Sequence, residues 1–144
     1  DTTDAPQMIE HVCQSVPLTP FDVKWIPSSA RFVMLGQTPS AKGAFHIITE
    51  EGKLNLINQW QKDYGIKSGT FKSSPVSVRD LATVDYKGKL HIYDIEKGVA
   101  KFEVQAHSAM GNVIDGIGGK GAEFGAPELI TGGSDGCVRV WDPR

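Results

Sequence analysis

The chain has 144 residues, of which 40% are hydrophobic and 22% charged. Fifteen Lys and Arg against 17 Asp and Glu give a net charge of −2, which favours neither nucleic acid nor an anionic membrane as a partner. No apolar run approaches the ~18 residues of a membrane span. The first residues lack the basic and apolar regions of a signal peptide, and the two cysteines fit no metal spacing. These features predict a cytoplasmic protein without metal or cofactor.

The N-terminal part of the chain predicts one strand without partners of its own, over residues 7–12, followed by a first group of four strands. The alternation of apolar and polar residues predicts strands over 21–26, 31–36, 44–49 and 53–58. Residues 38–43 form a polar loop in this prediction, and Glu50-Glu51-Gly52 forms a turn.

Two further groups of strands follow with the same order. The second is predicted over 66–71, 81–85, 89–95 and 100–105, and the third over 112–117, 128–133 and 137–142. The third strands of the three groups align at Ile48, Tyr93 and Trp141, which are 45 and 48 residues apart. This spacing is close to the 40–45 residues that one four-stranded propeller blade requires.

The last stretch carries the clearest motif. Leu129 to Gly133 is an apolar run, Ser134-Asp135-Gly136 is a turn, and Val138 to Asp142 alternates and ends in Trp-Asp. This stretch resembles the core of a WD repeat. The resemblance implies an all-β fold, a WD40 β-propeller, of which this chain supplies about three four-stranded antiparallel blades of a ring of seven.

The resemblance also implies a division of the chain into blades. Residues 1–15 are the closing strand of the last blade, 16–60 the first blade, 61–106 the second and 107–144 the third, which lacks its fourth strand. Three blades cannot close a ring, because propellers have at least four. We therefore expect a fragment of a longer chain, or a ring completed by another chain, since open edges and blade faces favour aggregation.

A structural tetrad carries over from WD repeats onto the third blade. It consists of His107, Thr131, Asp135 and Trp141, a set that can satisfy a buried imidazole through a carboxylate and a hydroxyl. The second blade keeps Thr83, but has Lys87 at the position of the turn Asp and Tyr93 at that of Trp. The first blade has Ile48 at the position of Trp, and no turn Asp. His107 and Asp135 could alternatively form a catalytic pair, but Thr131 and Trp141 favour the structural interpretation.

Three other patterns suggest ligand sites. Gly116 to Gly121 satisfies G-x-G-x-x-G, but a nucleotide loop of this kind requires a following helix, and Ala122 to Pro127 has loop composition. His46 and His91 occupy equivalent positions, for which surface placement is a better interpretation than metal binding. Cys13 and Cys137 are expected to be inert.

The end of the chain, Trp141-Asp142-Pro143-Arg144, resembles the W-D-x-R motif through which substrate receptors dock on the adaptor of cullin–RING ubiquitin ligases. Asp135, Trp141, Asp142 and Arg144 match that motif. The alternative is that Arg144 caps the strand and pairs with Asp142.

Candidate partner contacts lie in the predicted loops. They are Trp60, which is predicted in a loop, together with Tyr64, Tyr86, Lys87 and the 38–42 loop. Trp25 is predicted in the core.

Further stretches are similar to one group of WD-repeat proteins: 6–9, 21–27, 66–71, 90–92, 115–119 and 141–144. This resemblance covers nearly all of the chain and the N-terminal part of such proteins. It implies a non-enzymatic adaptor that works with a prefoldin-like co-chaperone assembly containing AAA+ ATPases and in the preassembly of axonemal dyneins. The sequence thus predicts a scaffold that binds proteins and has no catalytic residues or small-molecule substrate. A ubiquitin-ligase substrate receptor and a nucleotide-binding enzyme are the alternatives.

Overall fold

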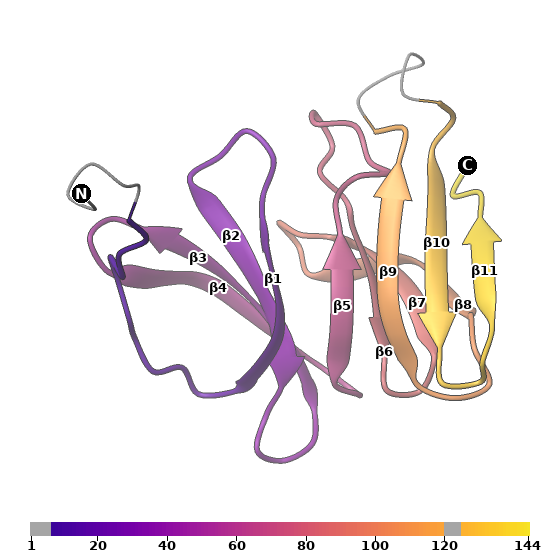
Figure 1. Cartoon of the computed structure of the whole chain (residues 1–144), viewed down its shortest axis with the longest axis horizontal. Helices are drawn as coiled ribbons and strands as arrows, with labels where there is room; N and C mark the ends of the chain where they lie inside the picture. Colours follow the sequence, from indigo (N-terminus) through magenta and orange to yellow (C-terminus); the bar gives the residue numbers. More distant parts are fainter. Residues whose placement is uncertain (1–6, 120–124) are drawn as a thin grey trace.

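The computed structural model describes residues 7–119 and 125–144, which form three antiparallel sheets (Figure 1). The first sheet contains β1 (Thr19–Trp25), β2 (Arg31–Gln37), β3 (Gly43–Glu50) and β4 (Leu54–Lys62). The second contains β5 (Ile66–Thr70), β6 (Leu81–Asp85), β7 (Lys89–Asp94) and β8 (Val99–Gln105). The third contains β9 (Gly111–Ile117), β10 (Glu128–Gly133) and β11 (Val138–Trp141). Within each sheet, the strands pair with their chain neighbours in order.

The all-β architecture of repeated four-stranded units is therefore confirmed, and every strand predicted within the three groups is present. The ends differ by up to four residues, with the largest difference at β4, which extends to Lys62. The strand predicted over 7–12 is not found in the described chain, where these residues have no regular secondary structure. The described strands include no partner for this segment, so its pairing with a last blade stays a prediction.

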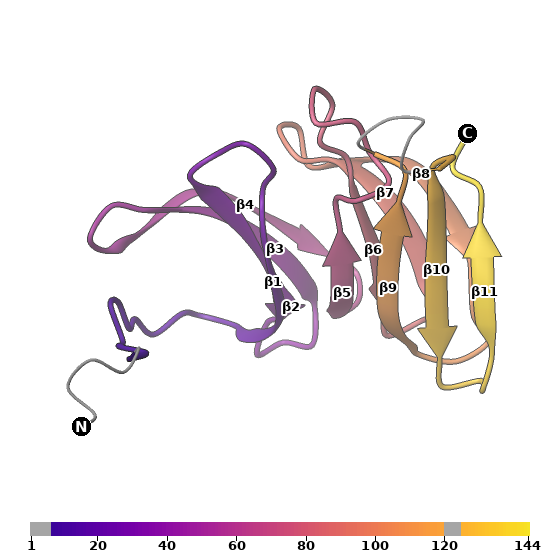
Figure 2. The same ribbon diagram turned by 45° about the horizontal axis from the view of Figure 1, so that its top comes forward.

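The three sheets are arranged side by side as propeller blades are. The first strand of each sheet is the innermost, and β5 lies between β1 and β9 (Figures 1 and 2). Asp22 of β1 links the first two sheets, since its carboxylate accepts the backbone N–H of Gly69 in β5 at 3.0 Å. Because the strands alternate in direction within each sheet, the chain turns β2–β3, β6–β7 and β10–β11 lie at the same edge of the molecule (Figure 1).

Apolar residues fill the space between adjacent sheets. The first cluster lies between the first two sheets and centres on Phe45, which is fully buried. Burial of a side chain of this size contributes about 1.5–3 kcal/mol. The second cluster lies between the second and third sheets and includes Val84, Leu90, Ile114 and Leu129.

The outward faces of the first and third sheets differ in how far they are covered by other parts of the chain. On the first sheet, Leu18 and Val16 of the N-terminal segment pack against Met34 and Ile48. On the third sheet, the face turned away from the second sheet carries five exposed apolar side chains: Val113, Ile117, Ile130, Val138 and Val140. The exposed blade face that the sequence predicts is thus found on the third sheet.

Candidate functional site

The turn between β10 and β11 positions the carboxylate of Asp135. Gly136 adopts a φ of +77°, which glycine permits without a Cβ clash, and the Asp135 carboxylate accepts the backbone N–H of Cys137 at 3.0 Å. The strand alternation of β10 directs Thr131 toward the second sheet, where it is 1% exposed. These local features place both acceptors beside His107, which precedes β9 and is also 1% exposed.

The structure brings the four residues of the predicted tetrad into one hydrogen-bonded network. Nδ1 of His107 lies 3.0 Å from Oδ1 of Asp135, and because a carboxylate only accepts, Nδ1–H is the donor. Nε2 then accepts the hydroxyl of Thr131 at 2.8 Å, and Nε1–H of Trp141 donates to the same hydroxyl oxygen at 2.9 Å. Each of these polar groups therefore has a partner.

Gly133 makes room for the imidazole. A Cβ at this position would lie 2.5 Å from Cγ of His107, a separation at which the ring would have to move. The sequence motif carries no signal for this requirement, because it identifies hydrogen-bonding groups and not the space between them.

Asp135 remains ionised in this environment. Burial alone would raise its pKa, but N–H groups of Cys137, His107, Ser108 and Arg139 together hold the pKa well below its usual range. Arg139, which the sequence did not single out, donates to Asp135 at 3.1 Å and to the carbonyl of Ala106 at 2.9 Å. The imidazole and the carboxylate are both enclosed and hydrogen-bonded, so the network stabilises the fold and leaves no face of His107 open to a substrate.

The second blade has a different polar arrangement at the equivalent positions. Gly88 has the φ of +77° seen at Gly136, which supports the alignment of the two turns. Asp85 stands at the position of Gly133, and its carboxylate accepts the N–H groups of Lys87 and Lys89. Burial raises the pKa of Asp85, although these N–H groups oppose the shift. Thr83, the counterpart of Thr131, is fully buried, and its hydroxyl has no hydrogen-bond partner among the described residues.

The two histidines of the first and second blades do not share a site. The expectation that His46 lies at the surface is wrong: it is 6% exposed, because residues 16–18 cover that side of the first sheet. Burial lowers its pKa. His91 is half-buried, with Nε2 at 3.0 Å from Glu103. Within 7–119 and 125–144, no group of three or more His, Cys, Asp or Glu side chains is placed to hold a metal ion.

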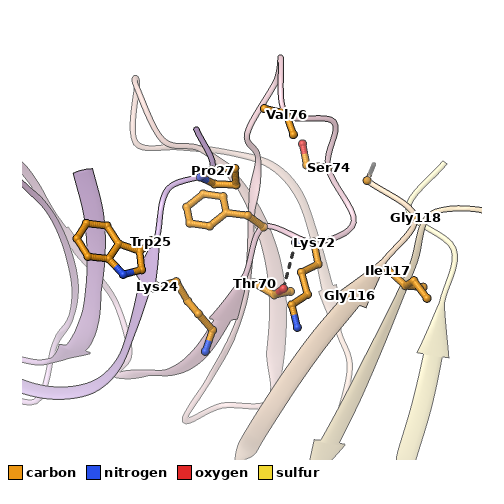
Figure 3. Close-up of a pocket in the computed structure, with 12 residues that line it drawn as sticks. Lys24, Trp25, Pro27, Thr70, Lys72, Ser74, Val76, Gly116, Ile117 and Gly118 are labelled. Carbon is orange, nitrogen blue, oxygen red and sulfur yellow. Dashed lines mark hydrogen bonds between the residues drawn. The ribbon is translucent and has the colours of Figure 1, made fainter. Parts of the chain in front are cut away.

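The glycine-rich segment after β9 contributes to a cavity of about 350 Å³ at the ends of the inner strands (Figure 3). Its walls are largely apolar and come from all three sheets: Lys24, Trp25, Pro27, Thr70, Phe71, Lys72, Ser74, Val76 and Gly116 to Gly119. Lys24 pairs with Asp22 at 3.0 Å, and Lys72 with Asp115 at 3.3 Å. Both described lysines that line the cavity are therefore paired with carboxylates, which leaves neither of them free to neutralise a phosphate.

The glycines are explained by close packing. A Cβ at Gly119 would collide with the backbone of Lys72 and Ser74, and its N–H already donates to the carbonyl of Lys72 at 2.8 Å. Residues 125–127, just before β10, are irregular, so the described residues supply no helix N-terminus for a pyrophosphate. Lys120 and Gly121 of the G-x-G-x-x-G pattern lie outside the described residues.

Two tryptophans are placed differently from the prediction. Trp25 is not in the core: it is 64% exposed, because it lies on the face of the first sheet that is turned away from the second, against Phe32. Trp60 is not in a loop but in β4, where it is half-buried and packs on Phe45 with ring centroids 4.9 Å apart. The indole of Trp60 also covers Gly98, so it has packing contacts within the chain.

The remaining candidate contacts lie near one another, at the edge where the chain passes from β4 to β5. Lys87 Nζ lies 5.3 Å from the ring centre of Tyr64. Tyr86 packs over Gly65, and the carbonyl of Tyr64 lies against Gly43, next to the 38–42 loop. Tyr64, Tyr86 and Lys87 therefore lie together, and their contact with a partner stays a prediction. Phe21 and Lys67, which the sequence did not single out, lie beside them.

At the end of the chain, Arg144 pairs with Asp142. The guanidinium donates to both carboxylate oxygens, at 2.9 and 2.8 Å, and the Arg144 backbone N–H donates as well. These bonds lower the pKa of Asp142 to about 2. Asp135 and Trp141, the other two residues of the ligase-type motif, are engaged in the tetrad described above.

No helix in the described parts of the chain is long and apolar enough to cross a membrane. No family model matches the sequence. Curated relatives do match: the chain is 42% identical to dynein axonemal assembly factor 10 of Bos taurus and 41% identical to those of Homo sapiens and Chlamydomonas reinhardtii. These alignments cover 98 to 100% of this chain and 40 to 41% of the relatives. Over its whole length, the chain is therefore homologous to about two fifths of dynein axonemal assembly factor 10, the WD-repeat protein Monad.

Proposed function

We propose that this chain is part of a non-catalytic, cytoplasmic WD-repeat scaffold that acts in the assembly of axonemal dyneins. The observation that carries the proposal is the identity of 41–42% across the whole chain to proteins named dynein axonemal assembly factor 10, from a green alga to mammals. Because the chain spans about 40% of those proteins, the activity and partners of the whole protein are part of the proposal.

The geometry supports a scaffold more than an enzyme. The pair of His107 and Asp135, which resembles catalytic machinery, is enclosed, and its members are held by Thr131 and Arg139. Rigid blades joined by short turns present several side chains at fixed positions, which suits a protein that holds partners together. The partners that the resemblance implies are a co-chaperone assembly containing AAA+ ATPases and dynein subunits.

We further propose that the third sheet continues into further blades of a seven-bladed ring. The exposed valines and isoleucines on its outward face would then be buried, as apolar residues are between the first two sheets. In such a ring, residues 1–15 would pair with the last blade.

The ligase-receptor alternative is less well supported. Docking through Arg144 requires its guanidinium to be free for a partner, whereas both of its hydrogen bonds go to Asp142 of the same chain. If ligase docking were the function, Arg144→Ala would abolish adaptor binding and leave the fold intact.

The test is mass spectrometry of the proteins that co-purify with the tagged full-length protein from its own cells. The scaffold proposal predicts AAA+ co-chaperone subunits together with dynein heavy or intermediate chains. Recovery of a cullin and its adaptor without chaperones or dyneins would refute it and make the Arg144 motif the functional centre.

A further inference from the structure

A β-bulge occurs at the same place in each inner strand. The pairing register between the first and second strands of each sheet skips one residue: Phe21 in β1, Lys67 in β5 and Asn112 in β9. A bulge turns the extra side chain away from the regular alternation of the strand, and bulges often position functional side chains. The recurrence indicates that the fold presents one selected side chain per blade at this edge.

The bulged residues contact two of the turns that follow second strands: Phe21 and Lys67 lie at the turn after β6, and Asn112 lies at the turn after β10. Lys67 Nζ lies 4.8 Å from the ring centre of Phe21 and 5.5 Å from that of Tyr86. The two rings meet edge to face, with centroids 5.8 Å apart. In the third blade, Asn112 donates from its side-chain amide to the hydroxyl of Ser134 at 3.0 Å. The contact between Phe21 and Tyr86 joins the first two blades at this edge.

Tyr64 and Lys87 lie beside these residues, with the Lys87 ammonium group 5.3 Å from the centre of the Tyr64 ring. Tyr64 is 40% exposed, and the next residue, Gly65, lies directly under the ring of Tyr86 and accepts the backbone N–H of Tyr86 at 2.9 Å. We call this group the lysine–aromatic surface: Phe21, Tyr64, Lys67, Tyr86 and Lys87. Its side chains contact one another, which reduces the conformational freedom that they lose on binding.

The charges of this surface are not neutralised within the described chain. Four other lysines form ion pairs with carboxylates at 2.9 to 3.3 Å: Lys24, Lys72, Lys89 and Lys101. Neither Lys67 nor Lys87 has a carboxylate within ion-pair distance among residues 7–119 and 125–144. Two cations are therefore positioned over aromatic rings and available to an anionic partner.

We propose that the lysine–aromatic surface binds an acidic peptide segment of a protein partner, with carboxylates on Lys67 and Lys87 and an aromatic or aliphatic side chain on Tyr64 and Tyr86. This inference rests on the proposed scaffold role, for which it names the chemistry of one partner. A peptide fits better than nucleic acid, because two cations on a chain of net charge −2 give little affinity for a phosphate backbone. The exposed Tyr64 and the partly buried Tyr86 also suit peptide contacts, since tyrosine is enriched in the centres of protein interfaces.

The test is fluorescence anisotropy with the full-length protein and a short fluorescein-labelled peptide that is rich in Glu and contains one Phe. The Lys67→Gln/Lys87→Gln variant is expected to bind it about tenfold more weakly, since each exposed ion pair contributes modestly. Lys67→Arg/Lys87→Arg is expected to bind like the wild type. The matched control is Lys53→Gln/Lys97→Gln, which removes two exposed lysines from turns at the other ends of the strands and is expected to bind normally.

Several results would overturn the proposal. One is equal weakening in the Lys67/Lys87 variant and the control, which would indicate a general charge effect. Another is the same affinity for a peptide in which every Glu is replaced by Gln, or no measurable binding of the acidic peptide. Tighter binding of a single-stranded oligonucleotide of the same charge would also overturn it. None of these results bears on dynein assembly, so the co-purification described above still tests the proposed function separately.

Discussion

Replacing Thr131 by Val tests whether the tetrad stabilises the third blade. Valine has nearly the shape of threonine, so the substitution removes a hydroxyl and leaves the packing of this fully enclosed position largely unchanged. That hydroxyl serves two neighbours: it donates to Nε2 of His107 at 2.8 Å and accepts Nε1–H of Trp141 at 2.9 Å. One substitution therefore leaves two polar atoms without their partner.

The expected loss follows from these two contacts. Leaving a buried donor or acceptor unpaired costs about 1–3 kcal/mol, and the half-buried indole can recover part of its loss by bonding to water. We therefore expect Thr131→Val to lower the free energy of unfolding by about 2–4 kcal/mol, which is large against the 5–15 kcal/mol by which typical domains are stable.

The second blade supplies the matched control. Thr83 occupies the equivalent place on β6 and is also fully buried, but its hydroxyl has no partner among the described residues. Thr83→Val removes a buried polar atom that makes no hydrogen bond there, so we expect it to be neutral or to stabilise the protein by up to about 1 kcal/mol.

Urea unfolding of the full-length protein and both variants, followed by tryptophan fluorescence, measures this difference. Unfolding midpoints at unchanged urea dependence report the change in stability. Equal destabilisation by the two substitutions would show that the methyl-for-hydroxyl exchange itself matters, and that the hydrogen-bonded network through Thr131 does not carry the effect.

Three further predictions concern other parts of the chain. Gly98→Ala is expected to displace the indole of Trp60, which covers this glycine, and to shift its fluorescence to longer wavelength. Burial lowers the pKa of His46 from 6.5, so the folded protein binds fewer protons at this residue than the unfolded chain. The free energy of unfolding is therefore not reduced by His46 above pH 6.5 and declines as the pH falls below that value, and His46→Leu should make this decline less steep. Arg144 lowers the pKa of Asp142 from 3.8 to about 2, so the contribution of this ion pair to stability is present above pH 3.8 and is lost as the pH falls through 2. Arg144→Gln should return the titration midpoint of Asp142 toward 3.8, as measured by NMR.

These predictions have their own controls. Gly52 has a φ of +79°, and a Cβ added there would have no neighbour within 4 Å, so Gly52→Ala reports backbone strain alone, at about 1 kcal/mol. Unfolding profiles of the wild type and His46→Leu that run parallel between pH 7 and 5 would contradict the account of His46. An Asp142 midpoint that does not move in Arg144→Gln would show that the ion pair does not form in solution.

Strand order and most strand boundaries could be predicted from the sequence, because the period-2 pattern repeats three times with turns rich in Gly, Asp and Pro between the strands. The tetrad residues were also identified, since hydrogen-bonding residue types at fixed spacing are visible in the last stretch. The Trp60 placement failed because β4 continues past Asn58 through polar residues, and its hydrogen bonds to β3 keep it extended there.

Other features depend on what packs against each residue, which one strand's pattern does not show. Trp25 alternates like a core residue, yet its side of the first sheet is only partly covered. His46 resembles a surface histidine, yet residues 16–18 fold over it. The bulges at Phe21 and Lys67 add a residue without changing the local composition, so these two members of the lysine–aromatic surface could not be recognised before the strands were paired.

The most direct test of the proposed function is a replacement experiment in Chlamydomonas reinhardtii, whose dynein axonemal assembly factor 10 matches the whole of this chain at 41% identity. In cells from which that gene is deleted, a chimera would carry this chain in place of the matching segment, and axonemal dynein heavy chains would be quantified in isolated axonemes. The account predicts that the chimera restores dynein to the amount obtained with the intact algal gene. A stably expressed chimera that leaves dynein at the level of the deletion strain would contradict the proposal that this chain serves in axonemal dynein assembly.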